Sequence, residues 1–383
     1  MRILLVNYEY PPLGGGGGIA MMEIATELAR RHEVHVLTSR TSAQEDVEKH
    51  PTLALTIHRV LVFGRSDRAT ASFLSMAAFL PTGIRRGKRL LADKPFDVVN
   101  TWFAIPSGIV GGAIARHGRV PHVLTIIGGD IYDPSKWYSP HRFFPAGMAA
   151  KWALRHAEAH VAISTDIARR AHEHFGAPDD IEIIPLGIAE PQFQQVPREA
   201  LGMSPGRKYI VAVGRLVRRK DYPTLLEALR ILDREDTSLL ILGDGPERER
   251  IEELARQLGI SHRVELRGFV SEEEKYQILA NSDVFALASL HEGFGVVYLE
   301  AMYCGLPIVA ADEGGQVDLL QDGATGKLVP IGDAKAIGDG LSELLADETL
   351  AERISDHNRK RIQKFSVSHL ADRYEQAFRR VCR

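Results

Sequence analysis

Short β-branched runs alternate with helical patterns along the whole chain, and this alternation most constrains its fold. In the first half, candidate strands lie at residues 3–8, 34–38, 96–100, 122–127, 161–163 and 181–184, with helical periodicity between them, as at 19–31 and 109–117. Strands and helices in alternation indicate a parallel sheet covered by helices on both faces. We therefore predict an α/β, doubly wound fold.

A proline-rich segment, residues 189–207, interrupts the pattern and is interpreted as a linker. The pattern then restarts, with candidate strands at 209–213, 238–242, 263–266, 284–288 and 307–310 and candidate helices at 222–233, 247–258, 272–280 and 295–303. Two Rossmann-like domains are predicted, at residues 1–190 and 191–365. A last helix, about 366–383, has an apolar face and is expected to cross back onto the first domain.

Length and composition exclude several classes of protein. The 383 residues exceed the roughly 250–300 that one core fills. A net charge of −3 argues against a dedicated nucleic-acid binder. Two cysteines form neither a disulfide framework nor a zinc cluster, and fit a reducing compartment. The first residues are typical of a strand rather than a signal peptide, and no apolar run approaches ~18–20 residues. A cytoplasmic protein is expected.

Five consecutive glycines, residues 14–18, lead from the first strand into a helix. Exposed backbone N–H groups at a helix start favour phosphate, and absent side chains allow close approach. A flexible loop is the alternative. A P-loop would end in Gly-Lys-Ser/Thr, whereas this loop ends Gly18-Ile19-Ala20. A dinucleotide site would need an acidic residue closing the second strand, which here closes with Thr38-Ser39-Arg40.

Two cations, Arg215 and Lys220, directly follow the first strand of the second half. Ligands of open α/β sheets bind beyond the carboxyl ends of the strands, where two cations can neutralise a diphosphate. The alternative is a solvated basic loop, in which Arg218 and Arg219 also face water.

Two carboxylates, Glu292 and Glu300, follow a later strand, with Gly293 and Gly295 beside the first. The spacing predicts Glu292 in the loop before a helix and Glu300 about one and a half turns into it. Glu292 can then reach a ligand hydroxyl, and Glu300 can accept the two hydroxyls of a ribose. Glycines also close other strands, at 243–246 and 268–269, which suggests a shared groove, although turn chemistry explains each alone.

Together these motifs resemble a family four retaining glycosyltransferase with the two-Rossmann-domain GT-B architecture (glycosyl transferase group 1). The resemblance is carried, in the family's order, by the glycines at 14–18, by Gly128-Gly129-Asp130, by Gly214-Arg215 with Lys220, by 243–246, by 268–269 and by Glu292 through Glu300. It implies two domains facing a central cleft, the first for the acceptor and the second for a nucleotide-sugar donor.

The resemblance also implies which residues form the site. As catalytic residues it implies Glu292, Asp130, Arg215 and Lys220, and as donor-binding residues Gly15, Gly16, Arg215, Lys220, Gly268, Phe269, Gly293, Phe294, Gly295 and Glu300. Arg215 and Lys220 would hold the diphosphate, Glu300 the ribose, backbone near Phe269 the base and Glu292 the donor sugar.

The first domain departs from the family pattern in one place. Many members carry a histidine before the Gly-x-Asp motif, where this chain has Ile127, so the role of that histidine is unassigned. Asp130 is a candidate for orienting or deprotonating the acceptor hydroxyl. The alternative is a turn or capping residue.

The implied reaction is sugar transfer, with retention, from a UDP- or GDP-linked donor to a glycan or lipid-linked glycan in cell-surface polysaccharide or glycolipid synthesis. The chain has no Asp-x-Asp motif, and neither a metal nor a cofactor is expected, the nucleotide sugar being a co-substrate. Front-face attack, with a diphosphate oxygen as base, is the usual proposal for the family. The alternatives are a nucleotide-sugar epimerase, a glycosyl phosphorylase of the same architecture and a non-catalytic nucleotide-sugar binder.

Residues 73–91 combine apolar side chains with four cations. Such a segment can rest on an anionic membrane, which would place the protein at the inner face of the membrane. Pro81 and Gly83 are expected to interrupt a long helix, so the alternative is an ordinary docked helix–loop–helix. Four aromatic residues, at 137, 138, 143 and 144, form a loop region that either joins the acceptor side or packs in the core.

Overall fold

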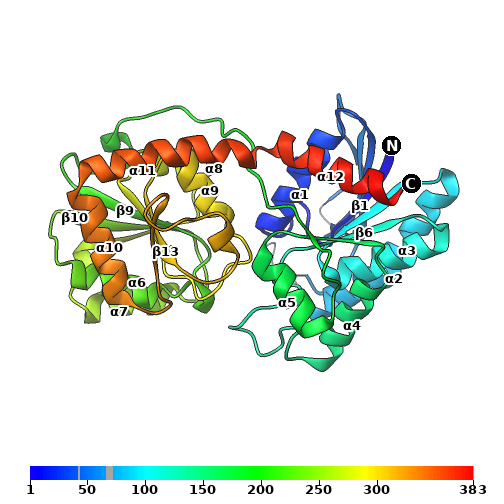
Figure 1. Cartoon of the computed structure of the whole chain (residues 1–383), viewed down its shortest axis with the longest axis horizontal. Helices are drawn as coiled ribbons and strands as arrows, with labels where there is room; N and C mark the ends of the chain where they lie inside the picture. The colour runs from blue at the N-terminus through cyan, green and yellow to red at the C-terminus, as the bar shows by residue number, and fades with distance from the viewer. Residues whose placement is uncertain (42–43, 66–71, 383) are drawn as a thin grey trace. The chain divides into compact units, whose positions relative to one another are not determined.

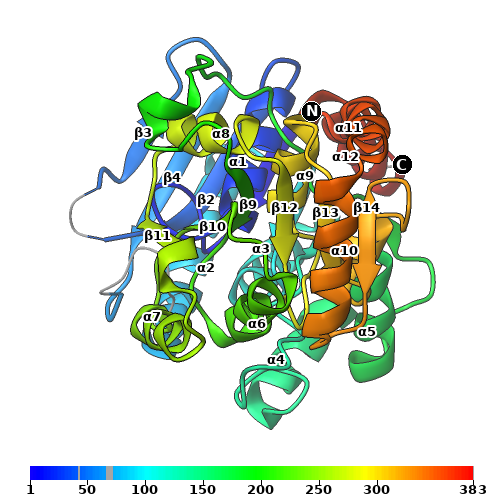
Figure 2. The same ribbon diagram turned by 90° about the vertical axis from the view of Figure 1, so that its left-hand side faces the viewer.

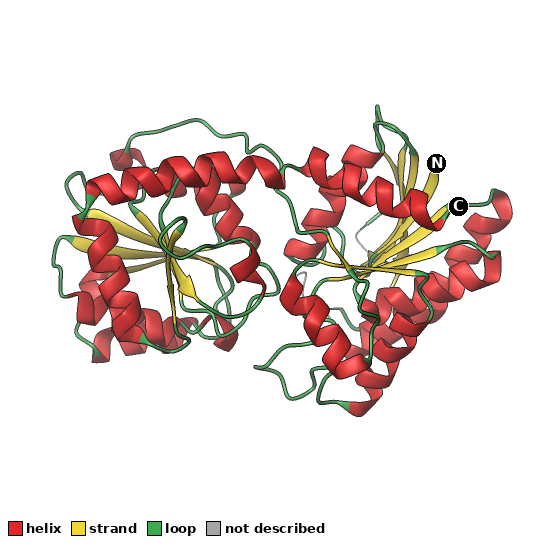
Figure 3. Cartoon of the chain, viewed as in Figure 1, coloured by secondary structure: helices red, strands yellow, loops and turns green. Residues whose placement is uncertain are grey.

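The computed structural model describes residues 1–41, 44–65 and 72–382, and the chain separates into two compact units (Figure 1). Unit 1 comprises Met1–Ala189 and Val367–Arg383, and unit 2 comprises Glu190–Ser366. Each unit is an α/β layer structure with helices on both faces of a sheet (Figure 3). Within the described residues, no helix combines the length and the hydrophobicity needed to cross a membrane.

The sheet of unit 1 has the strand order β3-β4-β2-β1-β5-β6-β7-β8. These strands are β1 (Arg2–Val6), β2 (Glu33–Arg40), β3 (Val47–Lys49), β4 (Leu55–Leu61), β5 (Val98–Trp102), β6 (His122–Ile126), β7 (Ala159–Ala162) and β8 (Glu182–Ile183). All of these pairings are parallel except that of β3 with β4. The strand order reverses between β1 and β5, which places the loops after these two strands side by side.

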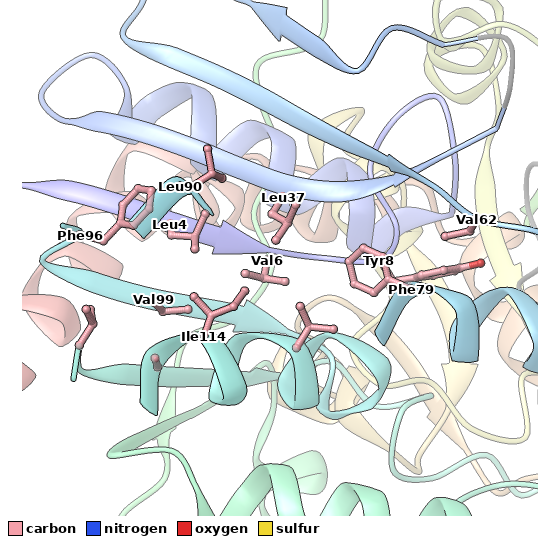
Figure 4. Packing of buried hydrophobic residues seen from close by; sticks show 13 residues of the cluster. Leu4, Val6, Tyr8, Leu37, Val62, Phe79, Leu90, Phe96, Val99 and Ile114 are labelled. Carbon is pink, nitrogen blue, oxygen red and sulfur yellow. The ribbon is translucent and has the colours of Figure 1, made fainter. Parts of the chain in front are cut away.

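Helices cover both faces of this sheet. They are α1 (Gly16–Leu28), α2 (Phe73–Asp93), α3 (Ile109–Gly118), α4 (Phe144–Arg155), α5 (Thr165–Phe175) and α12 (Val367–Val381). Helix α12 contacts α1, and its Tyr374 ring is buried against Trp102 with ring centroids 5.5 Å apart. On the opposite face, α2 and α3 enclose a core that includes Leu4, Val6 and Ile114 (Figure 4).

The sheet of unit 2 is parallel throughout, with the order β11-β10-β9-β12-β13-β14 (Figure 2). Its strands are β9 (Lys208–Val213), β10 (Thr237–Leu242), β11 (Val264–Gly268), β12 (Val284–Leu287), β13 (Ile308–Ala311) and β14 (Gly326–Val329). Its helices are α6 (Tyr222–Leu232), α7 (Arg248–Gln257), α8 (Glu272–Ala280), α9 (Val296–Tyr303), α10 (Ala334–Ala346) and α11 (Glu348–Arg361). In Figure 1, α8, α9 and α11 lie on one face of the sheet and α6, α7 and α10 on the other.

The prediction that Pro81 and Gly83 break the helical segment is wrong, because α2 runs through both residues. Proline lacks the N–H that would donate to the carbonyl of Ala77, four residues earlier, and α2 continues through this single missing bond. A Cβ on Gly83 would lie 3.0 Å from Val110 and one on Gly87 would lie 2.1 Å from Ile114. These glycines therefore permit the close packing of α2 on α3.

Three strands were not predicted: β3, β4 and β14. In β4, His58 and Arg59 interrupt the apolar run, yet both are buried. The ring of His58 lies 2.9 Å from that of His35 on β2, and Arg59 donates to the carbonyl of Pro11 at 2.8 Å. These partners are distant in sequence, so no local pattern reveals them. Strand β3 is three exposed residues, and β14 begins with a glycine.

Candidate active site

The strand order of unit 2 reverses between neighbouring strands β9 and β12. In open α/β sheets, ligands bind beyond the carboxyl ends of the strands at such a reversal. The loop after β9 contains Lys220, and the loop after β12 contains Glu292. The backbone joins these two loops, because the N–H of Leu290 donates to the carbonyl of Arg219 at 2.9 Å. The candidate site therefore lies at the position where open α/β sheets bind ligands.

Glu292 is buried between two cations from the loop after β9. Its Oε1 lies 2.7 Å from the Nζ of Lys220, and its Oε2 lies 2.8 Å from Nη1 of Arg219. Burial would raise the pKa of Glu292, but the charges of Lys220 and Arg219 outweigh it and hold that pKa well below its usual range. One ionised carboxylate and two cations sum to a single positive charge, which favours an anion.

Glu300 lies on α9 and forms a second buried ion pair. Its Oε1 is 2.8 Å from the Nζ of Lys275 on α8, while its Oε2 is buried and has no hydrogen-bond partner among the described residues. Burial raises the pKa of Glu300, and the charge of Lys275 offsets only part of that rise. The site thus contains a carboxylate oxygen that a ligand hydroxyl would satisfy.

Glycines shape the loop between Glu292 and α9. Gly295 caps the helix with φ +91°, and a Cβ there would lie 2.5 Å from the ring of Tyr298. The side chain of Phe294 is buried and packs near Phe365, so only its backbone is available to a ligand. The carbonyl of Glu292 accepts from the N–H of Gly315 at 2.7 Å, which ties this loop to the one after β13. Gly293 lies between Glu292 and Phe294.

The remaining predicted donor-site residues of unit 2 lie on the surface. Arg215 is exposed in the loop after β9. Phe269, after β11, is 90% exposed. Gly268 accepts at its carbonyl a 2.7 Å hydrogen bond from the N–H of Gly243. The ends of β10 and β11 are therefore joined, and the aromatic ring of Phe269 is exposed beside this junction.

In unit 1 the glycine run divides into an open and a packed part. A Cβ on Gly15 or Gly16 would meet nothing within 4 Å, whereas one on Gly17 would lie 2.8 Å from the ring of Phe103. Helix α1 begins at Gly16, earlier than the predicted residue 19, so the open glycines supply its first N–H groups. The N–H of Gly15 already donates to Oε2 of Glu9 at 3.2 Å, so a carboxylate lies beside the open glycines. The packed part explains why glycine is needed at residue 17.

Asp130 lies where the motif predicted it, at the carboxyl end of β6, but both its oxygens are occupied. Oδ1 accepts from the N–H of Gly128 at 2.7 Å and Oδ2 from the N–H of Ala104 at 2.5 Å. Burial raises the pKa of Asp130, and these hydrogen bonds oppose the rise. This geometry is that of a turn or capping residue, the alternative stated above for Asp130. Its two hydrogen bonds join the loop after β5 to the loop after β6. Ile127 is buried beside Gly17.

Sequence reasoning missed two residues of the candidate site, Arg219 and Lys275. Arg219 was placed facing water in the solvated alternative, although it pairs with Glu292. Lys275 was not singled out, because its partner Glu300 lies on another helix. A basic run was the only local signal for Arg219, and the sequence offers none for Lys275. Among the described residues, no group of three or more His, Cys, Asp or Glu side chains could hold a metal ion.

Both halves of the chain match known protein families. Residues 14–190 match the family described as Glycosyltransferase Family 4, and residues 194–361 match Glycosyl transferases group 1. A GDP-mannose-dependent alpha-(1-6)-phosphatidylinositol monomannoside mannosyltransferase of Mycolicibacterium smegmatis is 31% identical, over 90% of this chain and 89% of its own. The N-acetyl-alpha-D-glucosaminyl L-malate synthase of Bacillus anthracis is 27% identical, over 98% and 96%.

Solved structures resemble the whole fold. Sucrose-phosphate synthase from Thermosynechococcus elongatus has a TM-score of 0.84 at 24% identity and covers 99% of this chain and 98% of its own. HepE of Anabaena in complex with UDP has a TM-score of 0.80 at 20% identity, covering 99% and 100%. The chain therefore belongs to the family 4, group 1 glycosyltransferases and has two parallel-sheet domains of the GT-B type.

Proposed function

We propose that this glycosyltransferase moves a sugar from a UDP- or GDP-linked donor to a hydroxyl of a glycan or lipid-linked glycan, in the synthesis of cell-surface polysaccharide or glycolipid. The observation that carries the proposal is the buried cluster in which Lys220 and Arg219 both contact Glu292 at the reversal of strand order. Breaking the bond between sugar and phosphate builds negative charge on the leaving diphosphate, and preorganised cations stabilise that charge.

The names of related proteins support a nucleotide-linked donor. The mycobacterial relative is named as GDP-mannose-dependent, and HepE was solved in complex with UDP and with UDP-glucose. In this chain, Glu300 has a carboxylate oxygen with no partner among the described residues, which could accept from the ribose, and the exposed ring of Phe269 could stack on the base.

We further propose retention by front-face attack. The bond between the anomeric carbon and the phosphate oxygen breaks, the acceptor hydroxyl oxygen bonds to that carbon on the same face, and the hydroxyl proton passes to the departing diphosphate. Both oxygens of Glu292 are held by cations, which reduces its ability to act as a nucleophile. Glu292 would instead position the donor sugar and the two cations.

We expect Glu292→Ala to lower donor hydrolysis by roughly 10²–10³-fold while changing nucleotide affinity less, because its role is in the reacting geometry. Calorimetry with UDP and GDP, followed by a donor-hydrolysis assay, measures both quantities. Glu292→Gln removes the same negative charge with a smaller change in side-chain volume. The control is Glu265→Ala, an exposed carboxylate of the same unit. A wild-type protein that binds neither nucleotide, or a Glu292 variant with full turnover, contradicts the proposal.

The reaction is proposed to need no metal, since Lys220 and Arg219 can supply the positive charge that a metal would bring to the diphosphate. The hydrolysis assay described above, repeated in excess chelator, is therefore expected to keep its rate. Loss of activity that added divalent metal restores would refute this part of the proposal.

A peripheral membrane contact through α2 is proposed for the lipid-linked acceptor, with the protein at the inner face of the membrane. An aromatic patch of exposed or half-buried side chains lies around the start of α2 and consists of Phe73, Trp137, Tyr138 and Phe143. The neighbouring residues Leu74 and Phe144 are also exposed. Further along α2, a groove of about 460 Å³ is lined by Arg85, Lys88 and Arg89 with apolar residues. None of these three cations is ion-paired within the described part of the chain. Apolar and cationic side chains together suit an anionic bilayer.

We expect Arg85→Gln with Arg89→Gln to weaken sedimentation with anionic phospholipid vesicles about thirtyfold, because each juxtamembrane cation contributes ~1 kcal/mol. Neutral vesicles should bind weakly in every case. The matched control is Arg353→Gln with Lys360→Gln, which removes two exposed cations from α11. Equal vesicle binding by the two double variants would contradict the membrane contact.

A further inference from the structure

Lys275 is a buried cation that the reaction described above does not use. It lies on α8, only 8% exposed, and its Nζ is 2.8 Å from Oε1 of Glu300 and 2.7 Å from Oε2 of Glu272. Glu272 is largely exposed, whereas Glu300 is buried like Lys275. The contact with Glu300 is therefore the one shielded from water, where an ion pair is strongest.

The two oxygens of Glu300 differ because of this contact. Oε1 is occupied by Lys275, and Oε2 is buried with no hydrogen-bond partner among the described residues. A buried carboxylate oxygen without a donor is costly, so it indicates a group that a ligand completes. The ion pair fixes the plane of the carboxylate and therefore the direction in which Oε2 accepts.

We propose that Lys275 is a positioning residue that holds Oε1 of Glu300, so that Oε2 is left in a fixed direction as the acceptor for the ribose hydroxyls of the donor nucleotide. The inference rests on the proposed nucleotide-sugar donor and adds the origin of selectivity for ribose. A deoxyribose analogue leaves Oε2 unsatisfied, and the penalty is large only while the carboxylate is held in place.

Charge supports the same role. Burial alone would lower the pKa of Lys275, but Glu300 and Glu272 outweigh it, so that pKa is raised and the ammonium stays charged at neutral pH. Burial raises the pKa of Glu300, Lys275 and Lys220 lower it, and Glu272 raises it. The nearby thiol of Cys304 has a pKa raised to about 12 by burial and remains neutral. Removing Lys275 is therefore expected to raise the pKa of Glu300 further.

Calorimetry of the full chain with UDP or GDP, whichever the wild type binds, and with the matching 2′-deoxy and 3′-deoxy nucleotides tests the inference. In the wild type we expect ribose to be preferred about tenfold or more, the effect of one hydrogen bond to a charged group. In Lys275→Met the preference should fall to within about threefold of unity, and Lys275→Arg should restore it. Lys327→Met, which removes a half-buried, ion-paired lysine from β14, is the matched control and should behave as wild type.

The pH profile separates positioning from a merely structural role. Because Glu300 must be ionised to accept, the affinity of Lys275→Met for UDP, divided by that of the wild type, should rise as pH increases. Taking this ratio cancels the titration of the diphosphate itself. Lys275→Gln keeps a hydrogen-bond donor without the charge and should show the same rise. This variant tests the inference if Lys275→Met does not fold. Unchanged ribose preference together with a flat profile would overturn the inference and leave the donor assignment intact. A wild type that binds no nucleoside diphosphate would instead overturn the proposed function.

Discussion

Lys220→Ala is expected to lower turnover of the donor sugar by roughly 10²–10³-fold and nucleotide affinity by about tenfold or more. Lys220 is buried and touches Oε1 of Glu292 at 2.7 Å, so its loss changes the charge of the cluster from +1 to zero. A leaving diphosphate would then meet one cation of the cluster instead of two, and no net positive charge. Calorimetry with UDP and GDP and a donor-hydrolysis assay measure the two effects.

The control for Lys220→Ala is Arg218→Ala in the same basic run. The side chain of Arg218 is 77% exposed and lies 3.6 Å from Glu247, away from the buried cluster. Thermal unfolding of both variants separates loss of binding from loss of fold. We expect Lys220→Ala to remain folded, because Arg219 also pairs with Glu292 and would still neutralise its charge. Lys220→Arg should recover part of the activity. If Lys220→Ala binds UDP or GDP with the affinity of the wild type, this cluster is not part of the donor site.

Gly243→Ala is expected to destabilise the protein by about 3 kcal/mol or more, the sum of backbone strain and steric overlap. Gly243 follows β10 with φ +135°, and a Cβ there would lie 2.1 Å from the carbonyl oxygen of Gly214 after β9. The backbone fixes the position of the Cβ, and its partner is a backbone oxygen, so no rotamer change can relieve the overlap. Urea unfolding followed by circular dichroism, with linear extrapolation, measures the loss.

Gly259→Ala separates the two contributions to that loss. Gly259 also has positive φ, +72°, but a Cβ there would meet nothing within 4 Å. Only the conformational penalty applies, and about 1 kcal/mol is expected. Equal destabilisation by the two variants would show that the close approach of the loops after β9 and β10 does not govern stability.

Much of the fold follows from local patterns. Strands such as β1 and β10 are buried along their full length, and their apolar runs identify them as buried parallel strands. Segments that depend on distant partners were predicted wrongly or not at all. In α2, Gly83 and Gly87 meet α3, and in β4 the burial of His58 depends on β2 and that of Arg59 on the loop at Pro11.

The same division holds for the site. The motifs identify segments, so Lys220, Glu292 and Glu300 could be named from their glycines and strand ends. Pairing between segments was beyond this reasoning, because it depends on β9 lying beside β12 and on α8 packing against α9. Arg219 and Lys275 therefore became visible only as partners of the two carboxylates.

By itself the sequence determined the α/β class, the repeated strand–helix order and the resemblance to family 4, since periodicity, glycines and their spacing are local properties. Only the tertiary structure decided which cation meets which carboxylate, which glycines stay open and that both oxygens of Asp130 accept from backbone N–H groups. The physical reason is that charge pairing, burial and steric contact act between groups brought close by the fold. Their energies depend on distances that the order of residues does not contain.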